Sequence, residues 1–101
     1  MNKAEKIHYD KLFNLGCIVC LNSHYGYSAP HIHHIRHGAG IAQKSHWSKA
    51  IPLCPKHHQH GGFGIALHAG QKTFEKKFGT EEELLAQTLN LLGYNDEKDI
   101  L

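Results

Sequence analysis

The sequence predicts a small α+β protein, in which metal holds together a short β-hairpin finger between an N-terminal helix and a C-terminal helical cap. Three observations predict this class. The chain has 101 residues, the size of one small domain. Its three cysteines cannot all pair with one another in disulfides, and two of them have the Cys-x2-Cys spacing of a redox pair or half a metal site. The 11 histidines favour metal, and a structural ion would stabilise a core of this size.

Composition and charge narrow the function classes. Hydrophobic residues make up 41% and charged residues 20%, which is typical of soluble globular proteins. No apolar run approaches the roughly 18 residues of a membrane span, and no signal peptide follows Met1, so we expect no membrane partner. Residues 1–77 carry 10 basic and 3 acidic side chains, whereas residues 78–101 carry 1 and 6. This asymmetry suits a polyanion bound on one face, although ordinary charged helix surfaces would also produce it.

The N-terminal segment has the pattern of a helix. Over residues 3–15, Tyr9, Leu12 and Phe13 fall at i, i+3 and i+4, which predicts one apolar face. Gly16 follows and can adopt the left-handed conformation that caps a helix. We therefore expect a helix over residues 3–15.

A turn-rich stretch and a hairpin follow. Residues 16–30 contain the first cysteine pair and many turn formers. Residues 31–35 predict a short strand, residues 36–47 a glycine-containing loop, and residues 50–53 the second strand. Pro55 is well placed in the first turn of a short helix.

Two helices are predicted after the hairpin. Residues 71–78 place two phenylalanines at i and i+4 and end before Gly79. The sequence Thr80-Glu81-Glu82-Glu83 then matches a capping box, which opens a helix over residues 80–92. Its predicted apolar face consists of Leu84, Leu85 and Leu92, with Leu89 and Leu91 alongside. We expect this last helix to pack on the core and to carry no catalytic group.

Two half-sites have the spacing with which proteins bind tetrahedral zinc. They are Cys17-x2-Cys20 and Cys54-x2-His57, and an ion bound by both would close the 33 residues between them into a loop. On the residues alone the fourth ligand stays open among His57, His58 and His60. The x2 spacing favours His57. The alternative is a set of buried free cysteines.

Two His-His pairs belong to this predicted finger. If residues 55–60 are helical, His57 and His58 point about 100° apart, so that one can face the zinc and the other a cleft. His33 and His34 lie within the closed loop. Adjacent strand residues face opposite sides, so both reach one cleft only where the strand ends. Scattered surface histidines are the alternative explanation.

Three segments of the chain resemble a known family. PHIHHIR, AIPLCPKHHQ and LHAGQKTFEKKFG resemble the small phage RecA-dependent nucleases of the recombination-enhancement (Ref) type. More broadly, the order Cys-x2-Cys, His-His-Ile, Leu-Cys-x2-His-His resembles the HNH (His-Me finger) endonucleases. The resemblance covers roughly residues 16–79. It implies a ββα-metal finger as the core of a single nuclease domain spanning residues 1–101.

The resemblance also implies roles for individual residues. His34 matches the general base that activates water, a task that neutral imidazole suits near neutral pH. His33 matches a ligand of a catalytic Mg²⁺ or other divalent ion, His58 matches a ligand or a phosphate-facing histidine, and His68 completes this metal site. The structural zinc would be held by Cys17, Cys20, Cys54 and His57.

The partners implied by the resemblance are DNA and a RecA-type recombinase filament, in a phage- or prophage-encoded protein that acts in the bacterial cytoplasm. The candidate phosphate contacts are Arg36, Lys44, Lys49 and Lys56, which would position DNA rather than read its sequence. One position departs from the pattern. The HNH asparagine is expected about five residues before Cys54, where this chain has Ser48 and Lys49, so another group must orient His34.

Two competing functions need fewer of these residues. A non-catalytic zinc-finger protein that binds nucleic acid would keep the zinc site and the basic face but would tolerate loss of His34. A zinc-stabilised adaptor would use the acidic residues 80–99 as its contact surface. Only the nuclease needs a second metal site beyond the structural zinc.

Overall fold

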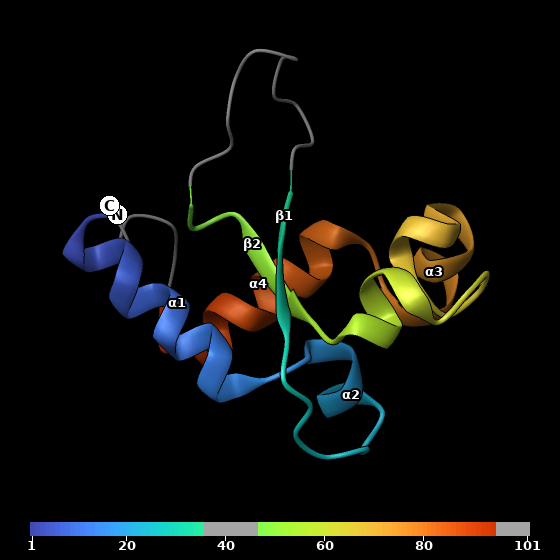
Figure 1. The fold of residues 1–101 in the computed structure, drawn as a ribbon, viewed down its shortest axis with the longest axis horizontal. Coiled ribbons are helices and arrows are strands. Elements are labelled where there is room, and N and C mark those ends of the chain that lie inside the picture. The colour runs from blue at the N-terminus through green and yellow to red at the C-terminus, as the bar shows by residue number, and fades with distance from the viewer. Residues whose placement is uncertain (36–46, 95–101) are drawn as a thin grey trace, which may run out of the picture.

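Helices surround one antiparallel pair of strands in the computed structural model, which describes residues 1–35 and 47–94 (Figure 1). The helices are α1 (Lys3–Leu15), α2 (Ile18–Asn22), α3 (Gln71–Phe78) and α4 (Glu81–Leu91). Two short turns lie between β2 and α3: the π-helical η1 (Lys56–His60) and the 3-10 helix η2 (Leu67–Ala69). No helix within the described ranges is long and apolar enough to cross a membrane.

The predicted hairpin forms the centre of the fold. Strand β1 (His31–His34) runs antiparallel to β2 (Ala50–Leu53), with His31 opposite Leu53 and His34 opposite Ala50. All four residues of β2 are buried, because this strand contacts α1, α2 and α4 (Figure 1). In β1, His33 is buried whereas its neighbour His34, on the opposite face, is exposed, and His31 at the start of the strand is exposed as well. The sheet therefore directs His33 inward.

The hydrophobic core lies between β2 and the helices that contact it. It includes Ile18, Ile51, Leu53, Phe74, Leu84 and Leu89. Burying one such side chain stabilises the fold by about 1.5–3 kcal/mol. Trp47 packs against this core at its edge. The capping box predicted for the last helix is confirmed, with mutual hydrogen bonds between Thr80 and Glu83.

Local details differ from the prediction at three places. In α1, Leu12 is buried with His8, whereas Phe13 is 46% exposed, because the ring of His8 packs between Trp47 and Tyr94. Residues 16–30 contain the short helix α2, whose first turn is capped by the sulfur of Cys17. In α4, Leu91 is exposed, while Thr88 is buried and its hydroxyl donates a hydrogen bond to the Leu84 carbonyl at 2.7 Å.

Candidate metal centres

Three cysteines and one histidine meet where α2, β2 and η1 come together. Cys17 and Cys20 flank the first turn of α2, Cys54 follows β2, and His57 lies in η1. All four are buried, and one donor atom from each lies within 4.8 Å of the others. The structure thus brings together the four residues predicted to bind zinc.

The spacing of these donors fits a tetrahedral zinc ion. Zn–S and Zn–N bonds of about 2.3 and 2.0 Å imply edges of about 3.8 Å between sulfurs and about 3.5 Å between sulfur and nitrogen. The sulfurs of Cys20 and Cys54 are 3.7 Å apart. Nδ1 of His57 lies 3.5 Å from the Cys20 sulfur and 3.6 Å from the Cys17 sulfur. The four residues are therefore close enough to bind a metal such as zinc.

Burial favours the uncharged forms of the side chains in this cluster. Burial raises the pKa of the Cys17 thiol to about 12, although backbone hydrogen bonds from Cys54 and Cys20 act in the opposite direction. Burial, together with Lys56 and Lys77, lowers the pKa of His57, so that its imidazole is neutral. A bound zinc would supply the charge that stabilises the thiolates, and its binding would release protons.

A second cluster consists of three histidines from β1, η1 and η2. Nδ1 of His33 lies 3.2 Å from Nε2 of His58, and Nε2 of His68 lies 2.9 Å from the same atom. Metal–nitrogen bonds of about 2.1 Å place adjacent ligand atoms about 3.0–3.4 Å apart. The three nitrogens therefore have the separations of ligands on one ion, and all lie within 4.8 Å of one another.

His58 is suited to bind a metal because it remains neutral. Burial lowers the pKa of His58 to about 4, and His33, His68, His31 and His60 act in the same direction. Its other ring nitrogen, Nδ1, lies 3.2 Å from Nδ1 of His31, a contact that sequence reasoning did not anticipate.

The wide turn of η1 directs adjacent histidines into different clusters. Its π-helical hydrogen bond runs from the Gly61 N–H to the Lys56 carbonyl at 2.9 Å. His57 faces the cysteines through Nδ1, and His58 faces the other histidines through Nε2. His60 is exposed. Of the three histidines that the sequence allowed as the fourth ligand of the cysteine cluster, the geometry thus favours His57.

His34 and the histidine cluster border the same cavity of about 510 Å³. The cavity is lined by Ile32, His33, His34, His58, His68, Gln71 and Glu81. The hydroxyl of Tyr9 lies 3.0 Å from Nε2 of His34. The spacing in the sequence places Tyr9 on one face of α1 with Leu12 and Phe13. Tyr9 is half-buried, and its hydroxyl reaches β1 because the buried face of α1 is the one that carries His8.

Helix α4 packs on the core as expected, and it also contributes a carboxylate to this cavity. The carboxylate of Glu81 lies 2.6 Å from Nε2 of His33, and the side-chain amide of Gln71 donates to its other oxygen at 2.9 Å. The sequence did contain a signal. Glu81 precedes Leu84 and Leu85 by three and four residues, which places it on the apolar face of the helix.

The comparison with protein families agrees with the resemblance seen in the sequence. A family model described as recombination enhancement, RecA-dependent nuclease matches residues 3–93. The chain belongs to this family. The matched range includes both clusters, and the family description connects the chain with nuclease activity in recombination. Among curated proteins, none shows significant similarity to this member of the RecA-dependent nuclease family.

Two of the four basic residues expected to contact DNA are among the described residues of this family member. Lys49, just before β2, and Lys56, at the start of η1, are both exposed. Arg36 and Lys44 lie outside the described residues. Lys56 directly precedes the two histidines that face the two clusters. A phosphate contact at Lys56 would therefore lie next to the candidate site along the chain.

Proposed function

We propose that this protein is a metal-dependent DNA endonuclease of the HNH type, with a structural zinc and a separate catalytic divalent ion. The observation that carries the proposal is the shared cavity: His34 and a three-histidine cluster line it together. In support of the expected finger, the short helical turn η1 follows the antiparallel strands β1 and β2. The Cys17, Cys20, Cys54 and His57 cluster would anchor that finger.

The proposed reaction is hydrolysis of a phosphodiester bond. His34 accepts a proton from a water molecule as the water oxygen bonds to phosphorus, and the bond from phosphorus to the leaving oxygen breaks. The divalent ion, when bound, would stabilise negative charge on the phosphorane and on the leaving oxygen. His33, His58 and His68 would hold it. Three imidazole ligands favour a transition ion over Mg²⁺.

The proposed setting follows from the family and the charge distribution. DNA is the proposed substrate, with Arg36, Lys44, Lys49 and Lys56 as phosphate contacts. A RecA-type filament is the proposed partner, since the family is described as RecA-dependent. We further propose a phage or prophage origin and action in the bacterial cytoplasm.

The proposal is tested by nicking of supercoiled plasmid. Purified protein is incubated with Mg²⁺, Mn²⁺, Co²⁺ or no added metal, with and without a RecA filament on the DNA. Nicking that requires added metal and is lost in His34→Ala supports the proposal. A protein that binds zinc and DNA but nicks under none of these conditions would instead be the non-catalytic zinc-finger protein.

DNA affinity is expected to depend steeply on salt. Each lysine that contacts a phosphate contributes about 0.9 to the slope of log K against log salt. Lys49→Ala and Lys56→Ala should each reduce this slope by about that amount. Fluorescence anisotropy with labelled duplex at several salt concentrations measures it, with Lys3→Ala at the start of α1 as the control. Unchanged slopes in both variants would remove these lysines from the DNA interface.

The hydroxyl of Tyr9 is expected to orient His34 in place of the missing asparagine. Burial raises the pKa of Tyr9, with Glu5 as a second cause, so the phenol keeps its proton at neutral pH. One hydrogen bond contributes about 0.5–1.5 kcal/mol, so Tyr9→Phe should lower kcat about 2- to 10-fold with KM unchanged. Tyr25→Phe, at a side chain that is 70% exposed, is the matched control. Equal kcat values for Tyr9→Phe and wild type would contradict this role.

A further inference from the structure

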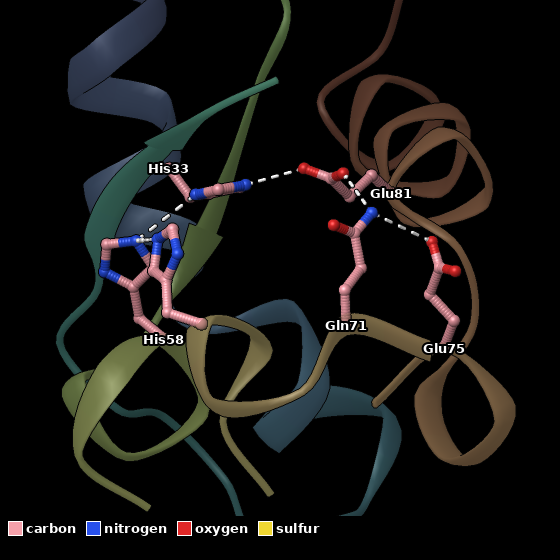
Figure 2. A network of polar contacts seen from close by, with 6 residues as sticks. His33, His58, Gln71, Glu75 and Glu81 are labelled. Carbon is pink, nitrogen blue, oxygen red and sulfur yellow. Dashed lines mark hydrogen bonds and ion pairs between the residues drawn. The ribbon is translucent and has the colours of Figure 1, made fainter. Parts of the chain in front are cut away.

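His33 lies between two different groups, one at each of its ring nitrogens. Its Nδ1 faces Nε2 of His58 at 3.2 Å, and its Nε2 faces the carboxylate of Glu81 at 2.6 Å. Figure 2 shows the ring reaching from β1 toward Glu81 on one side while His58 lies on the other. His33 and Glu81 are 9% and 8% exposed, so water competes little for this contact.

The carboxylate determines which nitrogen of His33 carries the proton. A neutral imidazole has one N–H donor and one acceptor, whereas an ionised carboxylate only accepts. The short contact therefore places the N–H of His33 on Nε2, where it donates to Glu81. The lone pair of Nδ1 is then directed toward His58 and His68, which is the form that can bind a metal ion.

The position of Glu81 is itself fixed by α3. The side-chain amide of Gln71 donates to Oε1 of Glu81 at 2.9 Å and to Glu75 at 3.3 Å, leaving Oε2 for His33 (Figure 2). Gln71 is the first residue of α3, and Glu81 is the first residue of α4. Both oxygens of the carboxylate thus have a partner on a different element of the fold.

We propose that Glu81, held by Gln71, is a positioning residue that orients His33 as a ligand of the catalytic ion. This inference rests on the proposed function in one respect only, namely that the histidine cluster binds a metal ion. Carboxylates in this arrangement fix the tautomer and orientation of a ligating histidine, and their loss weakens metal binding about 10- to 100-fold. Glu81 therefore sets the metal affinity of the cluster without binding the ion.

The test compares Glu81→Gln with Glu82→Gln in protein whose cysteine cluster is filled with zinc. The two substitutions remove the same charge from the same helical turn, but Glu82 is exposed. The titration with Co²⁺ is followed by the absorption spectrum of the bound ion. Co²⁺ bound only by histidines gives no charge-transfer bands from thiolates, so their absence shows that the ion is not bound at the cysteine cluster. We expect the Kd for Co²⁺ to rise about 10- to 100-fold in Glu81→Gln and to be unchanged in Glu82→Gln.

A second measurement reads the tautomer directly and needs no metal. In ¹⁵N spectra of the histidine rings, His33 should carry its proton on Nε2 in wild type and in Glu82→Gln. Glu81→Gln should shift it toward a mixture of both tautomers, because a neutral amide can also donate. If Glu81→Gln destabilises the fold, Gln71→Leu is used instead, because Gln71 is exposed at the start of α3. We expect this variant to raise the Kd for Co²⁺ by a smaller factor.

The outcomes separate this inference from the proposed function. Wild-type affinity and an unchanged His33 tautomer in Glu81→Gln would overturn the positioning role, whatever the nicking assay shows. A wild-type histidine cluster that binds no Co²⁺ would overturn it as well. A raised Kd in Glu81→Gln alone would support it, even if wild-type protein nicks no DNA and the nuclease proposal fails.

Discussion

Replacing His34 with alanine is expected to lower the nicking rate about 10²- to 10⁴-fold, the usual contribution of a positioned base. His34 is exposed at the end of β1, lines the cavity and lies outside the cysteine cluster. Its loss removes the proton acceptor but no core contact. The fold and the zinc content should therefore be unchanged, which separates a catalytic defect from a folding defect.

A surface histidine provides the control for this prediction. His24 is exposed and has a left-handed backbone with φ of 63°, which asparagine tolerates. His24→Asn and His34→Asn thus form a matched pair, measured by plasmid nicking beside elemental analysis for zinc. We expect normal nicking in the first and almost none in the second. Wild-type rates in both His34 variants would assign the base to another residue.

Replacing Cys54 with serine is expected to remove the zinc and unfold the finger. Structural zinc contributes about 10–16 kcal/mol of apparent binding free energy in zinc-finger peptides, whereas whole domains are stable by only about 5–15 kcal/mol. Cys54 joins the end of β2 to η1, and its sulfur lies 3.7 Å from that of Cys20. Losing this ligand should therefore abolish cooperative unfolding rather than merely lower the Tm.

Zinc content and circular dichroism, with and without a chelator, measure this loss. The histidines of η1 provide the matched comparison, because the sequence alone allowed any of the three to be the fourth zinc ligand. His57→Ala should lose zinc, whereas His60→Ala should keep it, since only His57 faces the sulfurs. A Cys54→Ser protein that folds fully without metal would show that the cluster is not a structural site.

Most of the secondary structure could be predicted because local forces determine it. The helix over residues 3–15, the strand over residues 50–53 and the helix over residues 71–78 occur with the expected bounds, and the first strand ends at His34, one residue earlier than expected. Caps such as Gly16 act within one turn of the chain, so their signal is local. The x2 spacing within each predicted half-site is equally local, and the four residues that it selected lie close enough to bind a metal such as zinc. The short helix α2 was missed because its cap is a cysteine sulfur.

The partners of the site residues were decided by tertiary packing. His33 and Glu81 are 48 positions apart and meet only because α4 packs on β2. Tyr9 reaches His34 because His8 lies on the buried face of α1. His8 is polar, so a search for regularly spaced hydrophobic residues does not identify this face. The sequence by itself thus determined the longer helices, the hairpin and the four candidate zinc ligands. The rotation of each helix about its axis, which sets the surroundings of each catalytic candidate, depends on the fit of side chains between elements, and that fit exists only in the folded protein.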